Sequence, residues 1–524
     1  MRGTNGKDVA PAAVAPREIE LKLLAPDGTL AGLDEAAVVV RHARNRGTVR
    51  RLEAIYYDTP SRRLFDRGWS LRVRRSGKQH VQTLKRAAAD GGPLVRDEWE
   101  TPVDGMLPDL SLLPAQEIGD ALDGEALVPI FATKVRRRSR AIELPDAVFE
   151  LALDDGIIEA GSRCTPLSEV EIELKAGDPA AIYDFAMALL DAAPLRVGTL
   201  SKAERGYQLA YDGAPRTSKA ASSGVAGAGS VDDAITVLLA GCQVQIMANQ
   251  AAAEGGGDPE GVHQMRVALR RLRSAVSVFR REVPSASLAT VAGEAKWAAS
   301  VLGPARNWDV LLGETLPAVE AGLAEEGLAI DLAGLRQAAE PLRSRAYATV
   351  RAAIVDPRYN RFLLSLGRLI ERRAWRNDVA SETLAALSEP VEPFARRALA
   401  RLDRKAAKQG EHFKRLSPEA RHELRKSLKK LRYASEFFRP LYPEAEAKRY
   451  LRRLSALQDA LGAANDIATA LPLVEEIAGA ATEAAVHRAA GAVLGWQLRD
   501  HREAGGPLKA AWADFKDVRP FWER

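Results

Sequence analysis

The sequence predicts a multidomain protein in which an N-terminal antiparallel β-barrel with some helix (α+β) precedes an all-α helical bundle with an internal duplication. Three observations support this fold class. The chain has 524 residues, more than one ordinary core accommodates. Short runs of alternating apolar and polar residues fill the first part, whereas helical periodicity dominates the second. A small, polar, glycine-rich stretch at 213–230 separates them and is typical of a flexible linker. The expected domains are therefore 16–212 and 231–520.

Composition narrows the class of protein. The chain has 75 Lys and Arg against 70 Asp and Glu, a net charge of +5, which does not by itself indicate an anionic partner. Two distant cysteines, Cys164 and Cys242, give neither a disulfide framework nor zinc-ligand spacing. The first 17 residues lack the apolar segment of a signal peptide, and no apolar run approaches the roughly 20 residues of a membrane helix. We therefore expect a cytoplasmic protein without a membrane partner.

Charged residues recur on one face of the predicted strands. In the run EIELK, Glu18, Glu20 and Lys22 point to one side, because strand side chains alternate. Later runs repeat this alternation at Arg72, Arg74, Lys85, Arg96, Glu98, Glu100, Arg136, Arg138, Glu169, Glu171 and Glu173. A sheet that exposes one face to solvent explains any single pair. If the sheet instead closes into a barrel of about eight strands, these charges line a lumen wide enough for one small ligand.

Such a lumen suits a phosphate chain together with a divalent cation. Arginine and lysine neutralise phosphate oxygens, and arginine does so through a bidentate fork. Clustered carboxylates would repel a polyanion unless a hard ion such as Mg²⁺ or Mn²⁺ lies between them. Water oriented in such a site can attack a terminal phosphorus in line, so the strands favour phosphohydrolase chemistry.

The helical half contains an internal repeat. A histidine-led basic segment begins at His263 and again at His422, and a Leu-Gly pair ends at Gly303 and again at Gly462, so both pairs are 159 residues apart. The helical spacing i, i+3, i+7, i+10 then gives each copy one stripe. The two stripes are His263, Arg266, Arg270 and Arg273, and His422, Arg425, Lys429 and Arg432.

These stripes favour binding of an anion. A solvated basic helix face is the ordinary alternative, but few acidic residues at i±4 balance the charges. Nucleic acid is disfavoured because no aromatic side chains that could stack on bases are interleaved in the stripes. The histidines lack metal-ligand spacing and are better suited to donate hydrogen bonds to phosphate.

The N-terminal motifs resemble the CYTH domains, the triphosphate tunnel metalloenzymes. Glu18-x-Glu20-x-Lys22 is similar to their ExExK signature, and the similarity continues in order through YYDT at 56–59, LRVR at 71–74, TLK at 83–85, RDEWE at 96–100, LDDG at 153–156, EIEL at 171–174 and SKAERGY at 201–207. This resemblance implies a closed tunnel that hydrolyses or cyclises triphosphates with a divalent metal. Lys175 stands where some members place a third glutamate.

The resemblance also implies roles for individual residues. The implied metal ligands are Glu18, Glu20, Asp154, Glu171 and Glu173. The implied triphosphate cradle is Lys22, Arg72, Arg74, Lys85, Arg136, Arg138 and Lys202. Glu18, Glu20, Lys22, Lys85, Glu171 and Glu173 are the residues expected to carry catalysis.

The helical half resembles the CHAD domain, from about residue 231 to the C-terminus. The two basic stripes match its pattern, as do LGPARNWD at 302–309 and LQDALGAAND at 457–466, although Asn307 stands where many members carry an acid. The resemblance implies that the eight stripe residues bind inorganic polyphosphate.

Together the two resemblances imply a protein like the bacterial CYTH-CHAD inorganic triphosphatases, which cleaves inorganic triphosphate to pyrophosphate and phosphate with Mg²⁺ or Mn²⁺. Two alternatives use the same tunnel: thiamine triphosphate hydrolysis and a class IV-type adenylate cyclase. A further alternative is an inactive protein that binds or targets polyphosphate. Association with polyphosphate granules in the cytoplasm is compatible with each of these, and the sequence leaves the oligomeric state open.

Overall fold

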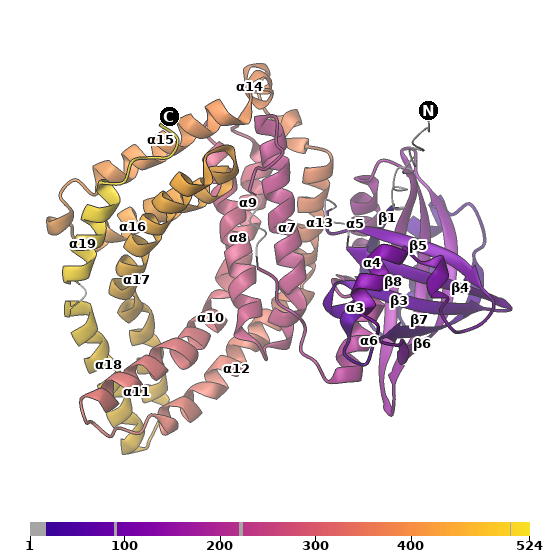
Figure 1. The fold of residues 1–524 in the computed structure, drawn as a ribbon, viewed down its shortest axis with the longest axis horizontal. Helices are drawn as coiled ribbons and strands as arrows, with labels where there is room; N and C mark the ends of the chain where they lie inside the picture. The colour runs from indigo at the N-terminus through magenta and orange to yellow at the C-terminus, as the bar shows by residue number, and fades with distance from the viewer. Residues whose placement is uncertain (1–16, 88–91, 220–223, 504, 524) are drawn as a thin grey trace, which may run out of the picture. The chain divides into compact units, whose positions relative to one another are not determined.

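The computed structural model describes residues 17–87, 92–219, 224–503 and 505–523. It divides the chain into two compact units, Met1–Gly213 and Ala214–Arg524. The first unit is built on β-strands and the second on helices, as Figure 1 shows.

Eight antiparallel strands of the first unit close into a barrel. The strands are β1 (Arg17–Leu24), β2 (Thr48–Asp58), β3 (Trp69–Ser76), β4 (Gln79–Ala87), β5 (Val95–Val103), β6 (Val128–Glu143), β7 (Ala147–Ala160) and β8 (Arg163–Gly177). Their order is β5-β4-β3-β2-β6-β7-β8-β1, and pairing of β1 with β5 completes the ring. A two-residue strand, β9 (Arg196–Val197), adds to β1. The predicted barrel is confirmed.

Strand register decides which charges face the interior. Residues directly opposite each other on neighbouring strands share a face of the sheet. Glu171 of β8 lies opposite Lys22 of β1, and Arg137 of β6 lies opposite Asp154 of β7. The charged alternation therefore belongs to the lumen.

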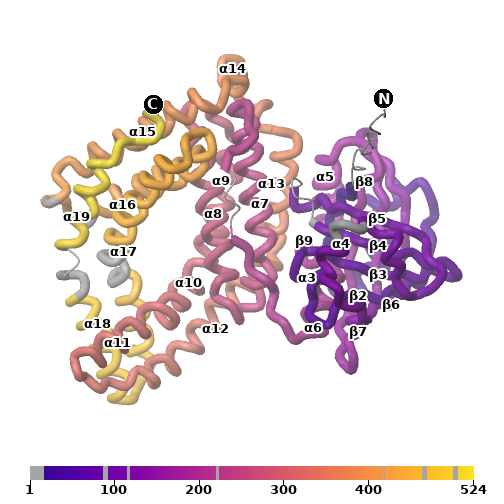
Figure 2. Tube along the Cα trace, in the orientation of Figure 1, coloured from indigo at the N-terminus to yellow at the C-terminus, as the bar shows by residue number. Residues whose placement is uncertain are grey.

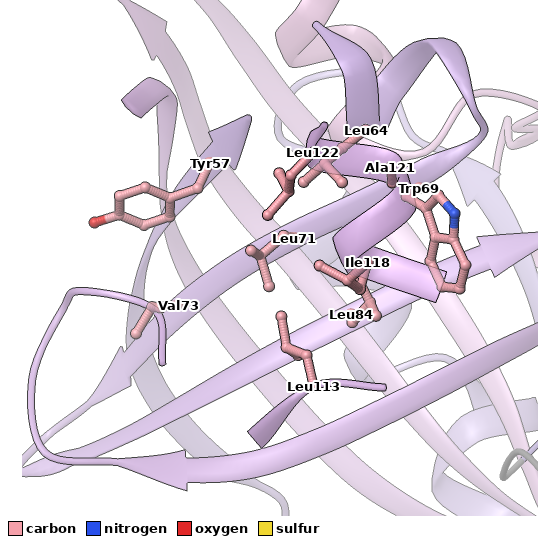
Figure 3. Close-up of a cluster of buried hydrophobic side chains, with 10 residues drawn as sticks. All are labelled: Tyr57, Leu64, Trp69, Leu71, Val73, Leu84, Leu113, Ile118, Ala121 and Leu122. Atoms are coloured by element: carbon pink, nitrogen blue, oxygen red, sulfur yellow. The ribbon is translucent and has the colours of Figure 1, made fainter. Parts of the chain in front are cut away.

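The outer face of the barrel packs under helices. These are α1 (Thr29–Asp34), α2 (Ala37–His42), α3 (Arg63–Asp66), α4 (Ala115–Leu122) and α5 (Ala181–Ala192), with a 3₁₀ turn at Leu110–Leu112. Figure 3 shows one such core, in which Leu71 and Leu84 of neighbouring strands meet Ile118 and Leu122 of α4. Because strand side chains alternate, burial of these outward leucines fixes the adjacent charged residues on the lumen side.

Helix α6 (Lys202–Tyr211) ends the first domain and begins with a capping box. The Ser201 side chain accepts a hydrogen bond from the Glu204 N–H, and the Glu204 carboxylate accepts one from the Ser201 N–H. This reciprocal cap fixes the start of the helix. It thereby fixes the first helical residue, Lys202, whose ammonium reaches into the barrel.

The second unit is built from helices, without a named β-strand among its described residues. Its α-helices are α7 (Val231–Gly255), α8 (Pro259–Phe279), α9 (Ala286–Val301), α10 (Gly303–Val310), α11 (Leu316–Glu325), α12 (Ala333–Val355), α13 (Pro357–Glu371), α14 (Ser381–Leu387), α15 (Val391–Gln409), α16 (Pro418–Phe438), α17 (Glu444–Ala480), α18 (Ala484–Glu503) and α19 (Gly505–Lys516). In Figure 2, α7, α8 and α9 run side by side. The predicted all-α second domain is confirmed.

The two copies of the repeat form equivalent helices. Both α8 and α16 are 21 residues long, begin with proline and are capped by a polar side chain, from Asp258 and Ser417 respectively. The two helices pack against each other, and Phe279 meets Phe438 edge-on with ring centroids 6.3 Å apart. The Leu-Gly pairs differ in context, because Leu302-Gly303 joins α9 to α10 whereas the pair ending at Gly462 lies inside α17.

Part of the predicted linker packs onto the helical unit. Val225 is fully buried, and its N–H donates to the carbonyl of Phe437. The Ser218 N–H donates to Oδ1 of Asn249, whose Nδ2 donates back to the Ser218 carbonyl. Among the described helices, α7 alone is long and apolar enough to cross a membrane by length and composition, and 56% of that apolar window is buried in the structure.

Candidate functional site

The inner part of the tunnel holds three carboxylates in close contact. Oxygens of Asp154, Glu169 and Glu171 lie within 4.8 Å of one another, and Asp154 and Glu169 are fully buried. Lys202 reaches all three, with its Nζ 2.8 Å from Asp154 and 2.7 Å from Glu171. Lys22 lies 2.6 Å from Glu171 and 3.4 Å from Glu169. The cluster is therefore compensated by protein cations.

Ion pairing outweighs burial in its effect on the pKa values of Glu171 and Lys22. Burial alone would raise the pKa of Glu171, but Lys202, Lys22 and Arg137 hold it well below its usual value. Burial likewise opposes the charge of Lys22, yet its carboxylate neighbours raise its pKa well above the ordinary range. The inner end is thus a network of buried ion pairs.

A second group of acids lies further out in the tunnel and is less fully compensated. Burial raises the pKa of Glu173; Lys175 opposes this shift, whereas the nearby charges of Glu18 and Glu150 add to it. Glu150 lies directly opposite Glu173 on the neighbouring strand. Like charges in this arrangement repel, and an added cation would relieve them.

The opposite wall of the tunnel is cationic. Arg72 and Arg74 project from β3, and their mutual repulsion, together with burial and Arg137, lowers the pKa of Arg74. The Nε of Arg72 is buried without a hydrogen-bond partner among the described residues. A phosphate oxygen would satisfy this donor and separate the like charges.

The acidic and cationic walls enclose a cavity of about 210 Å³. Its lining residues are Glu18, Glu20, Arg72, Arg74, Lys85, Glu98, Glu100, Arg137, Glu150, Ala152, Glu171, Glu173 and Lys175. Lys85 lies between the walls, with its Nζ 2.5 Å from Glu18 and 3.0 Å from Glu98. Phosphate would lie against the arginines, and a cation against the acids.

The structure corrects two residues of the predicted cradle. Arg136 is exposed on the outer face of β6, and Arg138 pairs with Asp34 of α1 at 2.6 Å, also outside the tunnel. Arg137 takes the lumen position instead and binds Asp154 through two hydrogen bonds, of 2.7 and 2.6 Å. Three consecutive arginines leave the alternation ambiguous by one residue.

Neighbouring residues on β6 explain the error. Apolar residues face outward on the other charged strands, so Val135 suggested an outer face. In the barrel, Val135 and Phe131 face inward, because the end of the lumen beside α6 is apolar. The lumen arginine is identified by the pairing of β6 with β7 in the structure, which places Asp154 opposite Arg137.

Three further tunnel residues had no role assigned from the sequence. Glu169 shares the alternation of Glu171, and its partners are Lys22, Lys202 and Arg205. Glu150 precedes the LDDG motif by three residues, in a strand that reads as apolar. Glu100 accepts a hydrogen bond from Thr83 at 3.1 Å and pairs with Arg74 at 3.3 Å. Period-two alternation within each strand was the available signal for all three.

The donor set of the outer acids fits a hard divalent cation. Mg²⁺ and Mn²⁺ prefer carboxylate oxygens, and Glu18, Glu20 and Glu173 supply them from adjacent strands. The inner carboxylates are close enough to share an ion, but an ion there would displace Lys202, Lys22 or Arg137. We therefore favour the outer acids, with Glu171 at their edge, whereas Asp154 holds Arg137 and Lys202 in place.

In the helical unit the two basic stripes merge into one patch. We call Arg266, Arg270, Arg425, Lys429 and Arg432 the basic patch. Arg270 of α8 donates to the Tyr433 hydroxyl of α16 at 2.5 Å. Burial and the four arginines of the patch together lower the pKa of Lys429 to about 8. The patch thus concentrates positive charge from both repeats.

The predicted stripe residues differ in their surroundings. Burial and neighbouring arginines lower the pKa of His263, whereas His422 and Arg273 are exposed. Arg432 is partly neutralised by Glu436 at 3.0 Å. Arg266 donates to the carbonyl of Ala299, and its own pKa falls to about 10 through burial and the nearby Arg270 and Arg306.

The repeated glycines lie in equivalent places in the two repeats. A Cβ added at Gly303 would lie 3.2 Å from an Nη atom of Arg266, and one at Gly462 would lie 3.6 Å from an Nη atom of Arg425. These arginines occupy the same position in the two repeats. Each glycine therefore lies beside the guanidinium of the first arginine of its own repeat. The side chains of 463–468, within the second Leu-Gly motif, lie outside the described residues.

Comparison with known proteins identifies both halves. The CYTH domain family matches residues 16–207, and the CHAD domain family matches residues 238–475. An inorganic triphosphatase of Haemophilus influenzae is 32% identical over 156 residues, which are 29% of this chain and 44% of that protein. This chain therefore spans less than half of that relative.

Two further relatives cover other parts of the chain. An uncharacterized protein of Mycobacterium tuberculosis is 27% identical over 465 residues, 81% of this chain and 83% of its own length. The crystal structure of the CHAD domain from the plant Ricinus communis is 31% identical, covers 58% of this chain and 98% of its own, and has a TM-score of 0.48. The chain therefore contains a CYTH domain at residues 16–207, followed by a CHAD domain at residues 238–475.

Proposed function

We propose that the tunnel hydrolyses inorganic triphosphate to pyrophosphate and phosphate with Mg²⁺ or Mn²⁺, and that the CHAD domain binds long-chain polyphosphate. The observation that carries the tunnel proposal is its division into two walls. On one side, repulsion from Arg72 lowers the pKa of Arg74; on the other, the nearby charges of Glu18 and Glu150 help to raise the pKa of Glu173. A triphosphate with a divalent cation has the complementary charge distribution.

Each wall would have its own task. Arg72, Arg74 and Arg137 would hold phosphate oxygens and stabilise charge that builds up in the transition state. Lys85 bridges the walls through Glu18 and Glu98 and would meet the substrate from the side. Lys22 and Lys202 would act indirectly, from the inner end of the tunnel, because they keep the inner carboxylates charged and in place.

Glu18, Glu20 and Glu173 would hold the cation, with Glu171 beside them. When bound, the cation would neutralise phosphate charge and help orient the attacking water. Burial and the charges of Glu18 and Glu150 raise the pKa of Glu173, and a bound cation would relieve this repulsion.

A substrate panel on the full chain tests this proposal. Tripolyphosphate, thiamine triphosphate and ATP are compared with Mg²⁺, with Mn²⁺ and with EDTA, and the products are identified by ³¹P NMR. We expect pyrophosphate and phosphate from tripolyphosphate only when metal is present. Faster turnover of thiamine triphosphate, or cyclic AMP from ATP, would replace the proposal with one of the other tunnel reactions. No metal-dependent turnover of any of them would favour an inactive polyphosphate-binding protein.

The proposed role of the CHAD domain rests on the basic patch, where Lys429 is surrounded by arginines from both repeats. Charge reversal at Arg266, Arg270, Arg425 and Lys429 should abolish binding of long polyphosphate and spare tripolyphosphate turnover. Lys426→Glu is the matched control, because Lys426 is exposed on the same helix and pairs with Glu423. Unchanged binding, or equal loss of both activities, would contradict this division of labour. A cytoplasmic location with association to polyphosphate granules is part of the same proposal.

A further inference from the structure

The barrel is closed at one end by its own side chains. Tyr56 and Phe131 stack inside the lumen with ring centroids 4.4 Å apart, and Tyr207 of α6 meets Phe131 edge-on at 5.4 Å. A Cβ added at Gly206 would lie 2.1 Å from the Phe131 ring, so α6 lies directly against this plug. The Tyr207 hydroxyl donates to buried Asp58 at 2.7 Å, which fixes the helix in place.

A second cavity, of about 420 Å³, extends the tunnel away from the plug. It shares Arg74, Arg137, Glu150 and Lys175 with the cavity of the proposed site, so the two are continuous. We call this second cavity the mouth. Because the plug blocks the other end, substrate enters and product leaves through the mouth.

The mouth continues the cationic wall beyond the proposed site. Ala54 lies opposite Arg74, and Arg50 follows four residues further along the same face of β2, about 13 Å away at about 3.3 Å per residue. Arg50 is exposed, and no carboxylate among the described residues pairs with it. A triphosphate held by Arg72 and Arg74 would leave Arg50 without a ligand.

We propose that the mouth is a binding site for the distal phosphates of a linear polyphosphate longer than three units, and that the tunnel removes the terminal phosphate from such chains. This inference rests on the proposed function of the tunnel. The chain end would enter first, towards the plug, while Arg50 holds the part that trails outward. Chain length, rather than an organic group, would then set the preference of the enzyme.

The reaction at the chain end is an ordinary hydrolysis. A water oxygen bonds to the terminal phosphorus, and the bridging P–O bond breaks with its electron pair left on the departing chain. The proton of the water passes to that chain or to solvent. Each turnover releases one orthophosphate and shortens the chain by one unit.

The lining of the mouth favours a polyanion over a nucleoside. It contains five basic side chains, Arg50, Arg74, Arg137, Arg140 and Lys175, and the carboxylate of Glu150. All of these basic groups except Arg50 also pair with carboxylates, so Arg50 carries the charge that a longer polyanion would meet. The apolar side chains of Leu52, Val81 and Val148 also contribute to the lining, so a nucleoside is the competing ligand that the experiment must separate.

The experiment compares Arg50→Ala with Arg51→Ala in the full chain. Arg51 is the next residue on β2, is also exposed, and lies opposite Arg136 on the outer face of the barrel. The substrates are tripolyphosphate, linear polyphosphate of defined longer length, cyclic trimetaphosphate and ATP. For Arg50→Ala we expect kcat/KM on the longer chains to fall about five- to tenfold, as for loss of one charge-assisted contact, with tripolyphosphate unchanged within about twofold. Arg51→Ala should match the wild type on every substrate.

Product analysis tests the direction of cleavage. ³¹P NMR should show orthophosphate from the first turnovers and gradual shortening of the chains, and cyclic trimetaphosphate, which has no end, should resist cleavage. Three results would overturn the inference: equal effects of Arg50→Ala on short and long chains, cleavage in the middle of chains, or an effect of Arg50→Ala confined to ATP. In each case, turnover of tripolyphosphate by the wild type would still support the proposed function. Absence of tripolyphosphate turnover in the wild type would instead contradict the proposed function itself.

Discussion

Replacing Lys202 with methionine removes one of the cations buried among the inner carboxylates of the tunnel. The Lys202 side chain is 9% exposed, and its ammonium contacts Asp154, Glu169 and Glu171. Removing one partner of a buried ion pair costs about 3–5 kcal/mol, because the remaining charge stays buried without its partner. We therefore expect the free energy of unfolding of the barrel to fall by about 3–5 kcal/mol.

This loss can be measured in the barrel alone by unfolding the protein in urea and monitoring the unfolding through hydrogen exchange of peptides from β7 and β8. At a slope of about 2 kcal/mol/M, the midpoint should fall by about 1.5–2.5 M. Lys175→Met is the matched control, because that lysine is 44% exposed and its pairs should contribute only about 0–1 kcal/mol. Adding Glu169→Gln to the Lys202 variant should restore part of the loss, because it removes a carboxylate that the variant leaves unpaired.

The pH dependence has a definite sign. In the wild type, Lys202 and Arg137 hold the pKa of Asp154 below its usual value in spite of burial. Its contribution to stability is present above the unfolded pKa of about 4 and is lost as pH falls towards the folded value. The variant has a smaller depression of this pKa, so the two stability curves should converge below about pH 4. A loss under about 1 kcal/mol at pH 7, or a gap that widens in acid, would refute the reasoning.

Three further predictions concern separate parts of the molecule. Arg137→Ala should lower kcat/KM for tripolyphosphate by about 100-fold or more, whereas Arg136→Ala, on the outer face, should leave it within about twofold in steady-state assays. Gly206→Ala should destabilise the barrel by about 1–3 kcal/mol in thermal unfolding, because the new methyl group overlaps the Phe131 ring; an unchanged midpoint would contradict the packing of the plug. Binding of long polyphosphate should weaken between pH 7 and 9, because Lys429, with a pKa of about 8, loses its charge in this range. Lys429→Arg should remove this pH dependence in calorimetric titrations. A pH dependence that survives in Lys429→Arg would show that another group causes it.

Alternation along strands predicted most of the tunnel because its physical cause is local. Glu18 and Glu20 share a face in any strand, and burial of Leu21 and Leu23 on the other side fixes which face is the lumen. Alternation alone left the closure of the sheet open, because a sheet with one face in solvent shows the same pattern, and the resemblance to CYTH domains implied the closed tunnel. The register of β6 could not be predicted either, because Arg137 is identified only by its pairing with Asp154 on another strand.

The sequence could not predict which charged side chains form ion pairs with one another. Asp154 reads as a metal ligand in isolation, and only the fold shows that Arg137 and Lys202 already bind it. The merging of the two basic stripes depends in the same way on packing of α8 against α16, which brings Arg270 to Tyr433. Periodicity places a residue on a face, and packing decides what that face meets.

The central claim is that the acidic wall of the tunnel holds the cation that tripolyphosphate hydrolysis requires. The most direct test measures Mn²⁺ binding by electron paramagnetic resonance, together with phosphate release, in wild type, Glu18→Gln and Glu159→Gln. Glu159 is the matched control, because it lies on β7 but pairs with Lys134 of β6 outside the cavity. Wild type and Glu159→Gln should bind Mn²⁺ and turn over tripolyphosphate, and Glu18→Gln should lose both. Full binding and turnover in Glu18→Gln would contradict the account.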